Sequence, residues 1–138
     1  MISSKGRYAV RVMLDLAMQE KGATVSLTDI AKRQLISKKY LEAIMRNLVA
    51  AHLVEGTRGK NGGYTLVREP ANYTIAEILE ASEGPLAPVA CLQPGAPTCN
   101  MAGKCMTLPL WKRYDAMIAA FFTENTLQSV LDESNVLV

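Results

Sequence analysis

The chain has 138 residues, of which 49% are hydrophobic and 20% charged, a composition that excludes a disordered chain and suits one domain with a hydrophobic core. No apolar run approaches the roughly 18 residues of a membrane span, and no signal-peptide core precedes the first amphipathic helix, so we expect a cytoplasmic protein with no membrane partner. The charge is divided: residues 1–69 hold 12 Lys and Arg against 6 Asp and Glu, whereas residues 70–138 hold 3 against 7. We expect the basic half to face phosphates.

The first predicted helix runs from Tyr8 to Met18, and Gly22 closes it. Apolar residues at helical spacing predict one buried face, made of Ala9, Val12, Met13, Leu16 and Ala17. A second, polar face is expected at i, i+4 spacing, made of Arg7, Arg11 and Asp15. We interpret this helix as scaffold.

A second short helix is predicted after Ser26, because Ser26-Leu27-Thr28-Asp29 has the pattern of a capping box. Only Leu35 and Ile36 then separate it from Ser37, whose hydroxyl is expected to cap a third helix. Two helices joined by so tight a turn are typical of a helix-turn-helix unit.

The third helix, beginning at Ser37, has an apolar stripe at i, i+3, i+4, i+7 and i+8, made of Leu41, Ile44, Met45, Leu48 and Val49. Long polar side chains gather on its other side, namely Lys38, Lys39, Glu42 and Arg46. The helix is therefore predicted to pack on one face and to offer polar arms to a ligand on the other. His52, the single histidine, is expected at its C-terminal end rather than in a metal site.

A hairpin is predicted next, because two short apolar runs, Leu53-Val54 and Tyr64 to Val67, flank a segment with glycines at 56, 59, 62 and 63. The tip carries two cations, Arg58 and Lys60, and an arginine in a glycine-rich loop suits the minor groove of DNA. Either piece alone has a plainer reading, as an amphipathic helix or a surface hairpin. Together they predict a recognition helix and a wing, and hence double-stranded DNA as partner.

Beyond the wing, Pro70 ends the strand, and Thr74 to Glu77 form another capping box. The helix that follows stops at Gly84-Pro85, and no regular element is expected between Leu86 and Lys104, a segment rich in proline and glycine. The three cysteines all lie in this region, at Cys91, Cys99 and Cys105. An odd number of cysteines in a cytosolic chain favours metal or redox chemistry over structural disulfides.

A longer helix is predicted from Pro109, with more apolar surface than a small winged domain covers, contributed by Leu110, Trp111, Tyr114, Met117, Ile118, Phe121 and Phe122. A second subunit is the expected cover, which predicts a homodimer, and packing within the monomer is the alternative. A last short helix is expected around Leu127, Val130 and Leu131. The predicted fold is mainly α with a small β-hairpin wing: a winged helix-turn-helix domain over residues 1–84, a cysteine loop over 85–106, and a dimerisation helix with a C-terminal helix over 107–138.

With these residues in view, the chain resembles the Rrf-two family of bacterial winged-helix regulators over nearly its whole length, about residues 1–131. The matching motifs are Ser4 to Ala9, Ser37 to Glu42, Leu53-Val54, Arg58-Gly59, Gly62 to Tyr64, Glu83 to Pro85, and Trp111. The resemblance implies a homodimeric, sequence-specific transcriptional regulator, expected to act as a repressor. It implies that Ser37, Lys38, Lys39, Tyr40 and Glu42 enter the major groove and Arg58-Gly59 the minor groove.

The resemblance also implies that Cys91, Cys99 and Cys105 bind an iron-sulfur cluster, either 2Fe-2S or 4Fe-4S, that senses iron, cluster supply, oxygen or nitric oxide. Two positions depart from the cluster-binding members of the family. Leu108 stands where some carry a histidine, and Arg7 stands where others carry an acidic residue. The fourth ligand is therefore unassigned, although Asp15 of a partner subunit is the first carboxylate available in the chain.

Several readings of the cysteines stay open. In the first reading, three thiolates take three corners of an iron-sulfur cluster. In the second, the cysteines form a thiol switch or are unused. Zinc is the third reading, since a structural zinc site needs four ligands and no fourth ligand is evident. A cluster-free regulator of the kind that represses cysteine metabolism is the alternative function. A small thiol or cluster-transfer protein is the rival from another class, but there is no C-x-x-C and no catalytic partner beside a loop cysteine, so an enzyme is not expected. A winged helix that only binds proteins is a further alternative.

We also expect the loop from Leu86 to Met106 to be the least ordered segment of the chain when no metal is bound.

Overall fold

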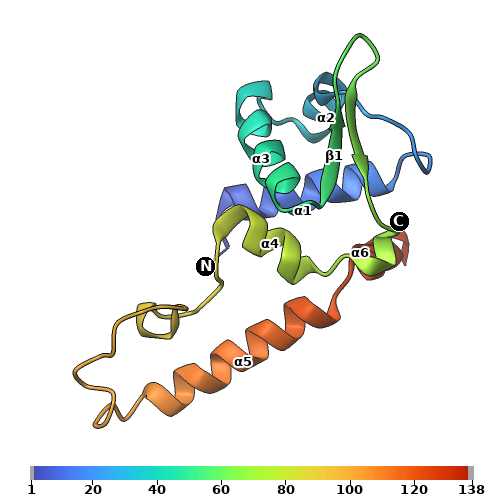
Figure 1. The fold of residues 1–138 in the computed structure, drawn as a ribbon. Coiled ribbons are helices and arrows are strands. Elements are labelled where there is room, and N and C mark those ends of the chain that lie inside the picture. Colours follow the sequence, from blue (N-terminus) through green and yellow to red (C-terminus); the bar gives the residue numbers. More distant parts are fainter. Residues whose placement is uncertain (1, 137–138) are drawn as a thin grey trace.

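Helices dominate the computed structural model, which describes residues 2–136 (Figure 1). The N-terminal part contains three helices and an antiparallel hairpin: α1 (Ser4–Ala17), α2 (Leu27–Gln34), α3 (Lys38–Ala50), β1 (Val54–Thr57) and β2 (Gly63–Leu66). The C-terminal part contains η1 (Pro70–Asn72), α4 (Ile75–Glu83), η2 (Ala90–Leu92), α5 (Leu108–Glu124) and α6 (Leu127–Val136). The prediction of a mainly helical chain with a small hairpin wing is confirmed.

The local capping signals have the predicted effect. The hydroxyls of Ser26 and Ser37 accept from the amides of Asp29 and Tyr40 at 3.1 and 3.2 Å, so each begins its helix where expected. Leu35, between α2 and α3, takes the left-handed conformation with φ 55°, which makes the turn tight. The helix-turn-helix unit is therefore confirmed.

Two predicted boundaries are wrong. The first helix begins at Ser4, before the predicted start at Tyr8, because Ser3 caps it by accepting from the amide of Gly6 at 3.3 Å. It ends at Ala17, and Gly22, with φ 79°, belongs to the turn beyond it. The segment from Leu86 to Lys104 is not wholly irregular either, since η2 forms one 3-10 turn in it.

The hydrophobic core lies between α1, α3 and α4, with β1 and the first residue of α6 closing it. Its fully buried members include Val12, Met13, Leu41, Ile44, Met45, Leu48, Tyr73, Ile78 and Leu127. Of the predicted core face of α1, Ala17 alone is only half-buried. The capping box of α4 is complete, because the Thr74 hydroxyl accepts from the amide of Glu77 at 3.1 Å and the Thr74 amide donates back to the Glu77 carboxylate at 3.0 Å. Gly84, with φ 78°, ends this helix as predicted.

The hairpin is attached to the segment before α2 by a single β-bridge at Val25. Within the hairpin Val54 pairs with Leu66 and Thr57 with Gly63. Leu53 and Val67 were predicted to belong to the strands, but each lies one residue outside its strand. The amide of Val25 donates to the carbonyl of Tyr64 at 2.9 Å, and the Tyr64 amide donates back at 2.8 Å. This bridge holds β2 against the segment that precedes α2.

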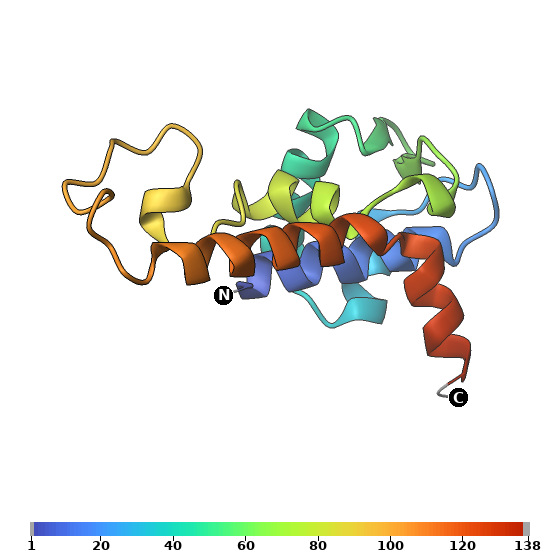
Figure 2. The same ribbon diagram turned by 90° about the horizontal axis from the view of Figure 1, so that it is seen from below.

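The long helix α5 lies on the side of the domain away from α2, α3 and the hairpin tip, with α4 between it and α1 (Figure 1). Figure 2 shows that the cysteine loop projects from the N-terminal end of α5 and that α6 turns away from its other end. None of the α5 side chains is fully buried, and Leu110, Tyr114, Met117 and Phe121 are exposed. Across residues 2–136, no helix is long and apolar enough to cross a membrane.

Candidate DNA-binding surface and cysteine loop

The third helix presents the polar side chains that its sequence predicted. Lys38, Lys39, Glu42 and Arg46 are exposed, while Leu41, Ile44, Met45 and Leu48 are fully buried. The exception is Val49, predicted to be core but 38% exposed. It lies about 80° round the helix from Leu41, at the edge of the apolar stripe, and lines a groove beside the hairpin.

Tyr40 differs from its neighbours because it is half-buried. Its ring packs edge-on against Tyr8 of α1 with the ring centres 5.7 Å apart, and the guanidinium of Arg11 lies 5.2 Å from the centre of the Tyr8 ring. This stack connects the start of α3 to α1. The sequence alone did not reveal the contact between Tyr8 and Tyr40.

The hairpin tip exposes Arg58, Gly59 and Lys60, as predicted. Gly59 has φ 110°, a conformation that side chains disfavour. Gly63 is required for a different reason, because a Cβ there would overlap the backbone carbonyl of Val25. The glycines therefore allow both the tight tip and the close approach of β2 to its neighbour.

A groove of about 630 Å³ separates α3 from the hairpin. Lys38 and Val49 line it from the helix, and Thr57, Arg58 and Tyr64 line it from the hairpin. Within the part of the chain that the structure describes, five exposed cations on these two elements form no salt bridge: Lys38, Lys39, Arg46, Arg58 and Lys60. The surface therefore offers unneutralised positive charge on both sides of the groove, which suits phosphates.

Three other basic residues of the same half are paired with carboxylates of the domain. Arg33 pairs with Asp15 at 2.7 Å, Arg68 pairs with Glu77 at 3.0 Å, and Lys21 pairs with Glu69. Lys21 and Arg33 have pKa values above the ordinary ones, chiefly because each side chain donates a hydrogen bond to a carboxylate.

Asp15 was predicted to line a polar face with Arg11, and that prediction is wrong. Its side chain is only 3% exposed and accepts two hydrogen bonds from Arg33 and one from Gln34, at 2.7 to 3.0 Å. Arg11 instead donates to Gln34. Because its oxygens are buried and bound, Asp15 is not available as a ligand for a partner's cluster.

The three cysteines are accessible, since Cys91 and Cys99 are exposed and Cys105 is half-buried. The sulfur of Cys105 lies 3.4 Å from the hydroxyl of Thr107. This hydrogen bond, together with the backbone amides of Thr107 and Leu108 at the start of α5, holds the pKa of the Cys105 thiol below its ordinary value.

The donor set fits an iron-sulfur cluster in its chemistry, because three accessible thiols on a loop with little regular structure can supply three soft ligands. They are not gathered: over residues 2–136, no three Cys, His, Asp or Glu side chains lie close enough to hold a metal ion. His52 is exposed beyond the end of α3 with φ 59°, far along the chain from the loop, and it is positioned as the sequence predicted.

The order of elements, the capped third helix and the cationic hairpin define a winged helix-turn-helix DNA-binding protein. The family model Rrf2, described as an iron-dependent transcriptional regulator, matches residues 2–133, and the chain belongs to this family. The predicted resemblance is confirmed, and a transcriptional regulator rather than an enzyme is what the relatives support.

Individual relatives agree with this assignment. A Neisseria meningitidis protein, provisionally named an HTH-type transcriptional regulator, is 38% identical over 97% of this chain and 89% of its own length. The HTH-type transcriptional regulator IscR of Vibrio atlanticus is 35% identical over 99% of this chain and 78% of its own. Among solved structures, CymR, the global cysteine regulator of B. subtilis, superposes with a TM-score of 0.78 at 32% identity, covering 96% of this chain and 97% of that one.

Proposed function

We propose that this protein is a homodimeric, sequence-specific regulator that contacts DNA with α3 and the hairpin and responds to the chemistry of its cysteine loop. The observation that carries the proposal is the distribution of charge. The cations of α3 and the hairpin tip are exposed and unpaired within residues 2–136, whereas Lys21, Arg33 and Arg68 are neutralised by carboxylates. A surface of this kind suits counterion release from DNA phosphates.

The proposed contacts divide between two grooves. The start of α3 supplies those to the major groove, through Ser37, Lys38, Lys39, Tyr40, Glu42 and Arg46. The hairpin supplies those to the minor groove and its phosphates, through Arg58, Gly59 and Lys60. Helix side chains reach base edges and thus choose the sequence, whereas wing cations meet the backbone and the groove shape.

This division can be tested with three variants on operator and random DNA. Arg58→Ala is expected to weaken binding to both and to lower the salt slope by about 1. Lys39→Ala and Glu42→Ala are expected to change which operator is preferred, since a good base contact contributes about 1 to 3 kcal/mol of discrimination. Equal losses on both kinds of DNA for all three variants would contradict the division.

The cysteine loop supplies the proposed sensor, with Cys91, Cys99 and Cys105 as the ligands of a cluster. A bound 2Fe-2S or 4Fe-4S cluster would supply redox and ligand-exchange chemistry at an incompletely protein-coordinated iron. The family description as iron-dependent supports this assignment. The loop joins α4 to α5, so ordering it can change how two winged domains are spaced on DNA.

A cluster-free regulator is the second candidate, and a specific observation favours it. The three thiols are not gathered in the described structure, and the chain superposes on CymR over 96% of its length. An absorption spectrum and an iron and sulfide assay of protein purified without oxygen separate the two candidates. Colour with bound iron and sulfide supports a cluster sensor, whereas colourless protein that binds its operator supports the cluster-free reading.

A triple variant, with Cys91, Cys99 and Cys105 changed to serine, tests whether the thiols act as a switch. Under the sensor proposal its operator affinity and the hydrogen exchange of its loop differ from those of the anaerobic protein. Identical exchange and identical affinity would mean that the cysteines have no regulatory role.

A further inference from the structure

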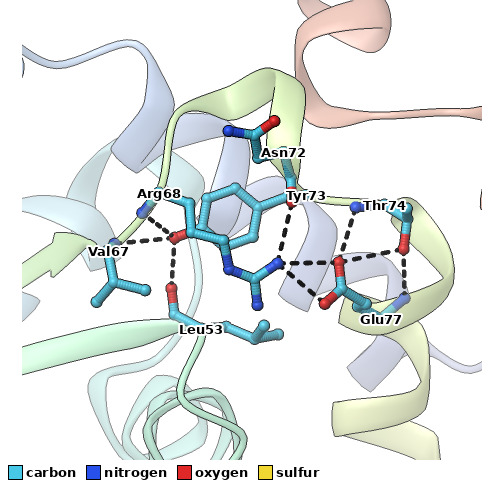
Figure 3. A network of polar contacts seen from close by, with 7 residues as sticks. All are labelled: Leu53, Val67, Arg68, Asn72, Tyr73, Thr74 and Glu77. Carbon is cyan, nitrogen blue, oxygen red and sulfur yellow. Dashed lines mark hydrogen bonds and ion pairs between the residues drawn. The ribbon is translucent and has the colours of Figure 1, made fainter.

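The hydroxyl of one buried tyrosine joins the two ends of the hairpin. Tyr73 is fully buried, and its hydroxyl accepts from the amides of Val67 and Arg68 at 2.9 and 3.0 Å and donates to the carbonyl of Leu53 at 2.8 Å (Figure 3). Leu53 directly precedes β1, and Val67 directly follows β2. A phenol has one donor and two acceptor positions, so this hydroxyl is fully used at the base of the hairpin.

Arg68 ties the same base to α4. Its guanidinium lies 4.7 Å from the centre of the Tyr73 ring, donates to the carbonyl of Asn72 at 3.0 Å, and meets both carboxylate oxygens of Glu77 at 3.0 and 3.2 Å (Figure 3). Glu77 is at the same time the third residue of α4 and completes its capping box with Thr74. The base of the hairpin is therefore connected through two polar side chains to the first turn of a core helix.

The length of the hairpin makes its base important for its tip. Each strand has four residues, and at about 3.4 Å per residue the tip lies roughly 14 Å from the base. A rotation of about 10° at the base would move the tip by some 2 Å, enough to break a hydrogen bond to DNA. The bridge between Val25 and Tyr64 holds only β2, whereas the Tyr73 hydroxyl holds the ends of both strands.

We propose that Tyr73 and Arg68 are positioning residues for DNA binding, which set the direction of the hairpin so that Arg58 reaches the minor groove. Arg68 belongs to the basic half of the chain, but its charge is paired with Glu77 and lies over the Tyr73 ring, so we do not assign it to DNA phosphates. The inference rests on the proposed function in assigning Arg58 to DNA. It goes further in saying which residues outside the DNA surface determine that contact.

A double-mutant cycle on operator DNA tests the role of Tyr73. Tyr73→Phe keeps the buried ring and removes only the hydroxyl, and we expect operator affinity to fall about fivefold, which is most of what the Arg58 contact contributes. Arg58→Ala is expected to cost roughly tenfold in the wild type but only about twofold in the Tyr73→Phe background, because the misdirected hairpin has already lost that contact. Faster hydrogen exchange of the Val67 and Arg68 amides in Tyr73→Phe is the direct sign of a released base.

Ile78→Val is the matched control, since it trims a fully buried residue of α4 and leaves the Tyr73 hydroxyl in place. It lowers stability by packing alone, so Arg58→Ala is expected to keep its full effect in that background. Additive effects of Tyr73→Phe and Arg58→Ala would overturn the inference. No effect of Arg58→Ala by itself would instead overturn the proposed wing contact, so the two failures are distinguishable.

The salt dependence of binding tests the role of Arg68. A cation that contacts phosphate lowers the salt slope by about 1 when it is removed, as expected for Arg58→Ala. Arg68→Ala is expected to weaken operator binding in the wild type and to leave the slope unchanged in the Arg58→Ala background, because there the wing contact is already absent and the charge of Arg68 is used within the domain. A slope that falls by about 1 more when Arg68→Ala is added to Arg58→Ala would identify Arg68 as a phosphate contact and overturn its positioning role.

Discussion

The backbone amide of Ser3 donates to the carboxylate of Glu83 at 2.6 Å, which joins the start of α1 to the end of α4. The Ser3 hydroxyl donates to the same oxygen. Gly6 leaves room for this contact, since a Cβ there would overlap the Glu83 carboxylate. Because the cysteine loop begins directly after Gly84, this carboxylate lies where the loop meets the DNA-binding unit.

Glu83→Ala is expected to lower the free energy of unfolding by about 1 kcal/mol, since two donors of Ser3 lose their acceptor at a partly solvated site. The effect of Gly6→Ala on the free energy of unfolding should then have opposite signs in the wild type and in Glu83→Ala. In the wild type the added methyl displaces the carboxylate, and the lost contact with Ser3 outweighs the helix propensity gained, whereas in Glu83→Ala the same change stabilises α1 by about 0.5 to 1 kcal/mol. Urea unfolding of the four proteins measures this, and the same sign in both backgrounds would contradict the contact.

Asp15→Ala is expected to destabilise the fold by about 1 to 3 kcal/mol, because the buried acceptor of Arg33 and Gln34 is removed. The side chain of Arg33 is 41% exposed and can turn to water, which limits the loss. Asp29→Ala, at an exposed position on α2, is the control and should have a small effect. If the protein binds a cluster, iron and sulfide per chain should be unchanged in Asp15→Ala, and a loss of both in folded protein would restore Asp15 as a ligand.

Glu77 makes stability depend on pH in a defined direction. Burial raises the pKa of this carboxyl, but hydrogen bonds from the Thr74 backbone and from Arg68 outweigh it and hold the pKa below the ordinary 4.5. A carboxyl with a lowered folded pKa stabilises the fold above its unfolded pKa, and this contribution is lost as the pH falls through the folded value. The difference in unfolding free energy between wild type and Glu77→Gln should therefore be constant near neutral pH and shrink below about pH 4.5. A difference that stays the same at acid pH would count against this account.

Phe121→Glu is expected to convert a dimer to monomers in sedimentation at micromolar concentration. Phe121 is 59% exposed on α5, so a second copy can bury apolar surface of this ring that the single chain leaves in water. Thr123→Glu adds the same charge about 200° round the helix and should leave the assembly intact. A wild-type monomer under these conditions would refute the proposed dimer.

Local patterns predicted the elements of this fold, and contacts between distant residues were what the sequence did not reveal. Ser37 and the capping box of Thr74 and Glu77 act within one helical turn, so their residue types suffice to predict them. Arg33 lies 18 residues from Asp15 in the sequence, Leu53 lies 20 residues from Tyr73, and Glu83 lies 80 residues from Ser3, so only the folded chain brings these pairs together. For the same reason the spacing of the cysteines predicted their chemistry but not whether they gather.

Thr107→Val is expected to slow the alkylation of Cys105 in cluster-free protein. The Thr107 hydroxyl, 3.4 Å from the Cys105 sulfur, is the main cause of the lowered pKa of that thiol, and the backbone amides of Thr107 and Leu108 act in the same direction. The thiolate is the nucleophile, so a higher thiol pKa leaves a smaller fraction of thiolate at any pH below the pKa. The midpoint of the curve of alkylation rate against pH should therefore move to higher pH. Thr107→Ser keeps the hydroxyl and should react like the wild type. Mass spectrometry of the alkylated peptides follows each cysteine separately, with Cys91 and Cys99 as internal references. Equal rates at Cys105 in the valine and serine variants would show that the hydroxyl does not activate this thiol.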